Sequence, residues 1–429
     1  MTLRGVLLCL LLSCGALAQE NDDWGDDDWN GDDWGEDPWA EEEAGLEWTG
    51  FVEAGGGVRL SSFGPTDFTL GEGRARVETQ YFWQAIDFSF KGDLGYDAVI
   101  DDEILQLREL AAAFGIGSNI DVKLGRQVLT WGTGDLLFLN DLFPKDFVSF
   151  FSGRDNEYLK APGDAVKISF FNKLFNVDFV WNHDFDPDEY INGERLVFFS
   201  PEAGRVVSPA SKLRADTPDD SEFALRLYKT VNAVEYAFYV YDGWFKQPNA
   251  VNNRGVPAFA RLRTYGASVR RSLGPGLANM EVAWYDSMKD DDGGNPRIPN
   301  DQFRLLGGYE WEAVKNFNVG LQYYLEWTQD HDELISNSPA PRFEPDEFRH
   351  VLTNRLTLKR MRDKLTLSLF TFFSPSDGDA YLRPTVEYRY SDAWQYSAGA
   401  NLFIGKDDHT FFGQLEDNSN LYARVRYYY

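Results

Sequence analysis

The chain has 429 residues and a formal net charge of −28 at pH 7. This acidic balance opposes binding to nucleic acid, and no stretch after residue 18 reaches the ~20 consecutive apolar residues of a transmembrane helix. Aromatic residues make up 16% of the chain although its mean hydropathy is only −0.42. So many large rings in so polar a chain are typical of a membrane β-barrel, where aromatic side chains form girdles at both interfaces.

Residues 1–18 have the features of a signal peptide. Arg4 supplies the positive charge, an apolar run follows, and residues 16–18 (Ala-Leu-Ala) form a small-residue cleavage site. The alternative interpretation is lipidation at Cys14, and both interpretations export the chain. Cys9 and Cys14 are its two cysteines. Cleavage after residue 18 therefore excludes disulfides, thiolate catalysis and cysteine metal sites in the mature protein.

Residues 19–47 form an acidic segment, with fourteen Asp and Glu and no Lys or Arg. Its four tryptophans recur every five residues, a period that matches neither helix nor strand. Because like charges oppose compaction, we expect a disordered periplasmic tail. Two roles stay open: a solvated spacer, or a docking peptide for a periplasmic or inner-membrane partner. In the docking role the anchors are Trp24, Trp29, Trp34 and Trp39.

From residue 48 to 429 the chain alternates apolar and polar side chains in segments of about ten residues. The last segment is the clearest, with Leu421, Ala423, Val425 and Tyr427 on one face and Tyr422, Arg424, Arg426 and Tyr428 on the other. Short, turn-like gaps alternate strictly with long polar gaps, which a soluble β-sandwich has no reason to produce. The long gaps are 61–71, 131–162, 184–220, 244–260, 288–301, 328–347 and 404–417.

We therefore predict an all-β fold, a transmembrane antiparallel β-barrel of about 18 strands (range 16–18). Short turns and both termini lie in the periplasm, long loops are extracellular, and the barrel sits in the outer-membrane lipid of a Gram-negative bacterium. Tyr429 ends an alternating strand with an aromatic carboxylate. Such an end resembles the signal that the barrel assembly machinery recognises, so we expect that machinery to be a partner.

Arginines collect at the inward positions of the predicted strands. On the lipid face each would cost ~2–4 kcal/mol near the midplane, which fixes the register. Inward acids at Glu78, Glu310, Glu326 and Glu387 pair with part of them. The arginines then either brace a wide barrel as a structural ladder or leave a surplus that favours anions. The predicted lumen- and solute-facing residues are Arg74, Arg76, Arg226, Arg270, Arg304, Arg355, Arg383, Arg389, Arg424 and Arg426.

Residues 107–147 carry a family resemblance. They contain Leu107-Arg108-Glu109, Leu124-Gly125-Arg126-Gln127, Trp131-Gly132, Leu139-Asn140 and Phe143-Pro144-x-Asp146. A strand ending in Gly-Arg-Gln, followed by Trp-Gly and an Asn-x-x-x-Pro-x-Asp element, resembles the alginate-export-like and porin-like outer-membrane barrels. The resemblance covers about forty residues and implies a constriction loop that folds into the lumen, here 131–162.

Arg126 interrupts the alternation, because Leu124 on the same face points outward. A bulge at Gly125 would turn the guanidinium inward. The loop 131–162 would then be pinned by Arg126 or its neighbours, with Asp135, Asn140 and Asp146 as candidate partners.

We expect no enzyme, metal site or cofactor. The histidines are His183, His331, His350 and His409, and their His-Asp adjacencies arise by chance in such acidic loops. The chain contains no His-x-Ser arrangement of the kind found in barrel phospholipases. The predicted function is an outer-membrane channel for a small or polymeric anionic solute. The alternatives are an export-system module whose tail docks a partner, with lipidic or polymer cargo, and, least favoured, an outer-membrane hydrolase.

Overall fold

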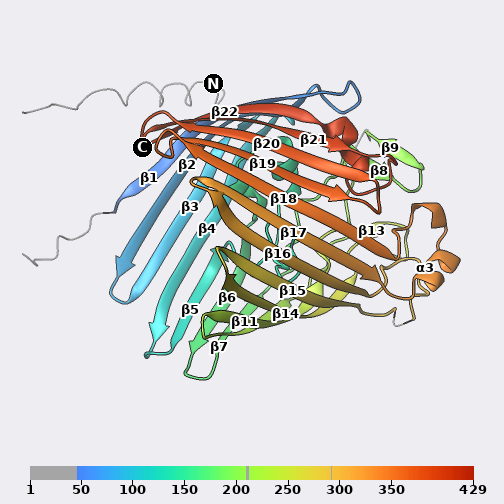
Figure 1. Cartoon of the computed structure of the whole chain (residues 1–429), viewed down its shortest axis with the longest axis horizontal. Coiled ribbons are helices and arrows are strands. Elements are labelled where there is room, and N and C mark those ends of the chain that lie inside the picture. The colour runs from blue at the N-terminus through green and yellow to red at the C-terminus, as the bar shows by residue number, and fades with distance from the viewer. Residues whose placement is uncertain (1–45, 209–211, 291) are drawn as a thin grey trace, which may run out of the picture. The chain divides into compact units, whose positions relative to one another are not determined.

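The computed structural model describes residues 46–208, 212–290 and 292–429, and within them eighteen antiparallel strands form one closed sheet (Figure 1). Consecutive barrel strands pair in order, and Phe51 of β1 lies opposite Tyr428 of β22, which closes the ring. The predicted all-β, eighteen-stranded barrel is confirmed. Its strands are β1 (Trp48–Arg59), β2 (Phe68–Trp83), β3 (Ile86–Asp97), β4 (Asp102–Ile116), β5 (Ile120–Gln127), β6 (Gly163–Phe171), β7 (Asn176–Asn182), β10 (Glu222–Val231), β11 (Val234–Trp244), β14 (Arg261–Leu273), β15 (Gly276–Ser287), β16 (Gln302–Val314), β17 (Phe317–Thr328), β18 (Phe348–Arg360), β19 (Leu365–Ser374), β20 (Asp379–Arg389), β21 (Trp394–Ile404) and β22 (Asn420–Tyr428).

Each barrel strand has an outer and an inner face. On β22, Leu421 and Tyr427 are exposed on the outer face, while Arg424 and Arg426 are buried on the inner face. Closure pairs the backbone groups of every strand with a neighbour, so no sheet edge meets lipid. The apolar outer face is what a bilayer requires, and the inner face carries the polar and charged side chains.

The two ends of the barrel carry different connections. Gly50 and Tyr429 exchange backbone hydrogen bonds at the end with the short turns, which we call the turn end. The opposite, loop end carries the long connections. The predicted strict alternation of short and long gaps is wrong at 98–101 and 375–378, which join strands at the loop end by only four residues. Four residues suffice to reverse an antiparallel pair, and nothing in the fold demands a long loop there.

Arg126 lies on the outer face of β5. Gly125 has a φ of 114°, yet Arg126 stays directly opposite Leu110 on β4 and Asp164 on β6. Opposite residues share a face, so Arg126 lies beside the exposed Leu110, and its guanidinium is 2.9 Å from the Asp164 carboxylate. The predicted bulge and inward Arg126 are therefore wrong. The glycine accommodates the local twist without adding a residue, and the alternation keeps its parity.

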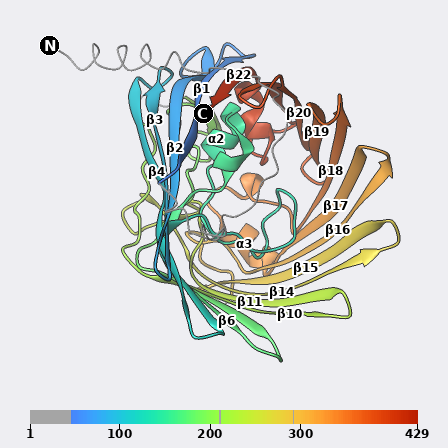
Figure 2. The ribbon, with the colours of Figure 1, turned by 90° about the vertical axis from the view of Figure 1, so that its left-hand side faces the viewer.

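The loops contain short helices and two-stranded ribbons. Figure 2 shows α2 inside the ring of strands. Within the described ranges, no helix is both long and apolar enough to cross a bilayer. The predicted signal peptide and the tail tryptophans lie outside the described residues. The loop elements are α2 (Phe147–Ser152), η2 (Asn156–Leu159), α3 (His331–Asn337), η3 (Pro341–Phe343), η4 (Gly413–Asn418), β8 (Phe198–Ser200), β9 (Arg205–Val207), β12 (Ala250–Val251) and β13 (Pro257–Ala258).

The two faces of β20 give a direct test of the register. Val386 is exposed on the outer face, and Thr385 beside it points inward. We expect Val386→Arg to lower the free energy of unfolding from lipid vesicles by about 2–4 kcal/mol if the site lies near the midplane. The matched control, Thr385→Arg, should cost far less. Equal losses for the two variants would contradict the register.

Candidate functional site

Residues 128–162, which we call the crossing segment, run through the lumen from one wall to the other. The backbone N–H of Gly134 donates to Glu281 on β15 at 2.8 Å. The Tyr158 hydroxyl donates to Asp93 on β3, across the barrel, at 2.7 Å. α2 lies between these two contacts in the sequence and inside the ring of strands in Figure 2.

The first half of the crossing segment is fixed to β15, β17 and β18. The Asn140 side-chain amide donates to Glu281 at 2.8 Å, and Glu281 is itself buried. The backbone N–H of Asp135 donates to Gln322 at 2.7 Å. Arg355 donates to the Asp135 carboxylate at 2.8 Å. Asp135 and Asn140 thus contact the wall, and their partners come from strands far from β5.

Asp146 organises the crossing segment from within. Its carboxylate caps α2 by accepting from the Ser149 N–H at 2.7 Å. At the other end, two wall asparagines, Asn401 and Asn420, each donate to the Phe151 carbonyl at 2.9 Å. The predicted pinning by Arg126 is wrong, because that side chain faces outward and the three candidate partners are engaged elsewhere.

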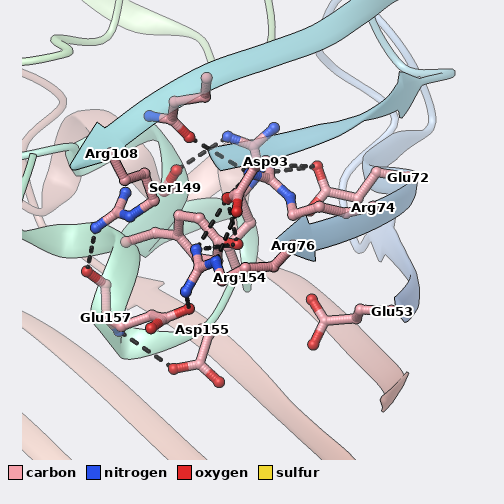
Figure 3. Close-up of polar contacts among 12 residues, drawn as sticks. Glu53, Glu72, Arg74, Arg76, Asp93, Arg108, Ser149, Arg154, Asp155 and Glu157 are labelled. Atoms are coloured by element: carbon pink, nitrogen blue, oxygen red, sulfur yellow. Dashed lines mark hydrogen bonds and ion pairs between the residues drawn. The ribbon is translucent and has the colours of Figure 1, made fainter. Parts of the chain in front are cut away.

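The second half of the crossing segment is held by a buried ionic cluster, which we call the anchor cluster (Figure 3). Asp93 lies at its centre. Arg76 Nε donates to one Asp93 oxygen at 2.6 Å, and Arg74 Nη1 and the Tyr158 hydroxyl donate to the other at 2.9 and 2.7 Å. Its members are Glu53, Glu72, Arg74, Arg76, Asp93, Arg108, Arg154, Asp155, Glu157, Tyr158, Arg424 and Arg426.

The crossing segment supplies carboxylates that the wall arginines need. Arg424 pairs with Asp155 at 3.1 Å, and Arg76 pairs with Glu157 at 2.5 Å. Burial opposes ionisation of Asp155, but Arg424 and Arg426 outweigh it and hold the pKa of Asp155 below its ordinary value. Buried charges are costly unless they are paired. Removing the segment would leave these arginines short of partners, so the cluster fastens the segment to the wall.

Five of the predicted solute-facing arginines lie beneath the loops. Their exposed fractions run from 0% to 8%, because the crossing segment covers them, and so they are not solute-facing as predicted; they are Arg74, Arg76, Arg383, Arg424 and Arg426. Arg383 donates to Asn156 and its guanidinium lies 4.2 Å from the Phe150 ring centre. The other predicted arginines are more accessible. Each is paired with an acid except the exposed Arg389; the paired ones are Arg226, Arg270, Arg304 and Arg355.

Two of the cavities in the lumen contrast in their lining. One of about 590 Å³ lies toward the turn end, and its wall includes Lys123, Lys167, Asp178 and Arg226. The other, of about 450 Å³, lies toward the loop end, and half of its lining residues are Phe or Leu. A polar lumen was expected from the inward arginines, and this apolar cavity was not. The signal was present in residues 135–151, which are too rich in Phe and Leu for a solvated loop.

Asp93, the centre of the anchor cluster, was not predicted either. Asp93 lies directly opposite Arg76 in the pairing of β2 with β3. Such a cross-strand pair becomes visible only once the exact register is known. Arg154 and Glu157 gave no signal, because their contacts depend on how the crossing segment folds.

The histidines contact different partners and do not gather in one site. His350 Nδ1 is 2.8 Å from the Tyr323 hydroxyl, and His331 Nε2 is 2.9 Å from the Pro345 carbonyl. His183 lies beside Asp184. Across the described ranges there is no group of three or more His, Cys, Asp or Glu that could hold a metal ion.

Asp188 joins three inward loops. It accepts from the Lys145 N–H at 2.7 Å and from the Gln247 amide at 2.8 Å, and its own N–H donates to the Lys246 carbonyl at 2.9 Å. Burial raises the pKa of Asp188 to about 6, although Lys145 and Gln247 oppose the shift. The junction of the crossing segment with loops 183–221 and 245–260 therefore carries a carboxylate that titrates near neutral pH.

Searches against protein-family models and curated proteins find no match. Solved structures do match. OccAB4 of Acinetobacter baumannii has a TM-score of 0.53 at 9% identity over 90% of this chain and 99% of that one. OccK5 of Pseudomonas aeruginosa gives 0.52 at 11% over 90% and 97%, and OccK11 of the same organism gives 0.51 at 10% over 89% and 95%. The chain has the fold of a porin-like outer-membrane barrel. At these identities the likeness shows the fold alone.

Removing one hydroxyl from the anchor cluster tests its role. Tyr158→Phe deletes the donor to Asp93 in a buried site. We expect the free energy of unfolding to fall by about 1–3 kcal/mol and open-channel current noise to rise as the crossing segment loosens. Tyr228→Phe on β10, whose ring lies under Arg226, is the control. A Tyr158→Phe chain as stable and quiet as the wild type would contradict the anchoring role.

The pH dependence of stability tests the Asp188 junction. Its pKa is higher in the folded chain than the ordinary Asp value of about 4, so folding takes up a proton. The free energy of unfolding should therefore fall as pH rises from about 4 to 6 and level off above that range. Urea unfolding of the wild type and Asp188→Asn between pH 4 and 8 isolates this slope. Parallel curves for the two chains would show that Asp188 does not cause it.

Proposed function

We propose that the chain is an outer-membrane channel that passes small anionic solutes past the crossing segment. The observation that carries this proposal is a group of basic side chains on the turn-end side of the lumen that share their carboxylate partners. Asp178 forms ion pairs with both Lys167 and Arg226. Glu235 forms ion pairs with both Arg226 and Arg270. These three cations therefore share two carboxylates, and a third carboxylate, Asp121, lines the same cavity as Asp178.

The three cations remain accessible to a solute. Their side chains are 31% (Lys167), 20% (Arg226) and 43% (Arg270) exposed, whereas Asp178 is only 5% exposed. Accessible basic side chains within low-dielectric walls attract anions, and rings of such side chains favour them in pores. The crossing segment occupies the middle of the lumen, which favours a small solute over a polymer.

Several narrower predictions stay open beside this proposal. Docking of a periplasmic partner rests on the tryptophan repeat of residues 19–47, which lie outside the described ranges. Recognition of Tyr429 by the assembly machinery, the alginate-export-like resemblance and the role as an export module remain predictions of the sequence. Deleting residues 20–46 and testing for loss of transport or of a co-purifying periplasmic protein examines the docking role.

Reversal potentials in planar bilayers test the anion preference. The double change Arg226→Ser and Arg270→Ser removes two accessible positive charges from this wall and leaves its carboxylates in excess. We expect the anion-to-cation permeability ratio to fall by about twofold or more. Arg271→Ser is the matched control, because Arg271 is the next residue on β14 and faces outward. An unchanged ratio in the double variant would reject the proposal.

A further inference from the structure

We propose that the loop end of the lumen holds a binding site for a small, uncharged hydrophobic molecule. The site is the cavity of about 450 Å³ introduced above, which we call the apolar vestibule. Its volume falls within the roughly 300–1,000 Å³ typical of small-molecule sites. The proposal is independent of the anion preference, because it depends on a different set of side chains at the other end of the lumen.

Several separate parts of the chain supply the apolar lining. The crossing segment contributes Phe138 and Leu142, and the loop 405–419 contributes Phe411. The barrel wall contributes Val351 of β18 and Phe372 of β19, both buried at inward positions where a water-filled channel would carry polar side chains. Apolar side chains from several elements therefore converge on one partly open cavity.

The charged residues of the β16–β18 wall already have partners. Arg304 lies 3.3 Å from Glu326, and its guanidinium lies 3.8 Å from the centre of the Tyr285 ring. Arg349 pairs with Asp377 at 2.7 Å. These side chains border the vestibule as neutral pairs.

The lysines contributed by the loops are paired as well. Lys145 lies 3.0 Å from Asp141 and donates to a neighbouring carbonyl. Lys246 lies 2.7 Å from Glu222. Asp188, the remaining charged residue of the lining, is held by the Lys145 N–H and the Gln247 amide. A charged ligand would lose its hydration, which is costly, and would meet side chains that are already engaged. An uncharged molecule avoids that cost, so the chemistry of the lining selects it.

The vestibule is preformed. Phe150 and Phe151 in its floor pack against Tyr381 with ring centres 6.0 and 5.6 Å apart. The wall asparagines described above hold the Phe151 carbonyl. Apolar cavities that cannot collapse bind water poorly and take up apolar molecules such as benzene. A rigid apolar vestibule is therefore suited to an apolar ligand.

Photolabelling of the full chain in lipid nanodiscs tests the site. The probe is 3-trifluoromethyl-3-phenyldiazirine, an uncharged aromatic carbene precursor, with labelled residues located by mass spectrometry. We expect saturable labelling within 136–151 and at 411–412. Labelling of lipid-facing residues such as Leu321 should rise linearly with probe concentration, since the bilayer has no fixed number of sites. Lumenal labelling that is absent or does not saturate would overturn the proposal.

A cavity-filling variant and its matched control sharpen the test. Val351→Trp fills the vestibule, whereas Leu352→Trp adds the same ring to the outer face of the same strand. We expect Val351→Trp to reduce lumenal labelling at least fivefold and to leave lipid-face labelling unchanged, which also reports a folded barrel. If Val351→Trp does not fold, the saturation curve of the wild-type chain decides alone. Loss of the vestibule signal leaves the reversal-potential result untouched, so the two proposals fail separately.

Discussion

The interior of this barrel depends on the pairing of buried charge. Asp93 receives two arginines from the neighbouring strand and the hydroxyl of Tyr158 from the crossing segment. None of these groups reaches bulk water, so each depends on the others to offset its desolvation. Because Asp155 and Glu157 complete the set from the crossing segment, the wall is electrostatically complete only when that segment lies across the lumen. The crossing segment must therefore lie across the lumen for the charges of the wall to be neutralised.

The consequence for function is a lumen with two chemistries. On the turn-end side of the crossing segment, accessible cations share carboxylates between them, which supports the proposed preference for small anions. On the loop-end side, phenylalanines from the segment and the loop 405–419 meet apolar wall residues, and the bordering charged groups are paired or hydrogen-bonded. The arginines that looked most like a solute path, Arg74 and Arg76, act as fasteners instead. Arginine thus has a structural role on one wall and remains accessible to solutes on another.

The features that could be predicted from the sequence are those that follow from the two-residue alternation of apolar and polar side chains. The alternation in β22 fixed its two faces, and strand count and closure followed from repeating it. The prediction of a bulge at Gly125 failed, because a glycine in a strand sequence does not reveal whether an extra residue is inserted there. Prediction also failed where register decides, because Asp93 meets Arg76 only through the pairing of β2 with β3. The contacts of Tyr158 and Glu157 depend on tertiary folding and have no local signal. The apolar vestibule did have one, in the Phe- and Leu-rich run 135–151.

The most direct test of this account is the single-channel conductance of a chain without the crossing segment. Gln127 and Gly163 are paired neighbours on β5 and β6, so a four-residue turn can replace 128–162 and leave the barrel closed. If the segment sets the aperture, conductance in planar bilayers rises severalfold and the current becomes less selective. A closed, folded barrel with wild-type conductance would contradict the account.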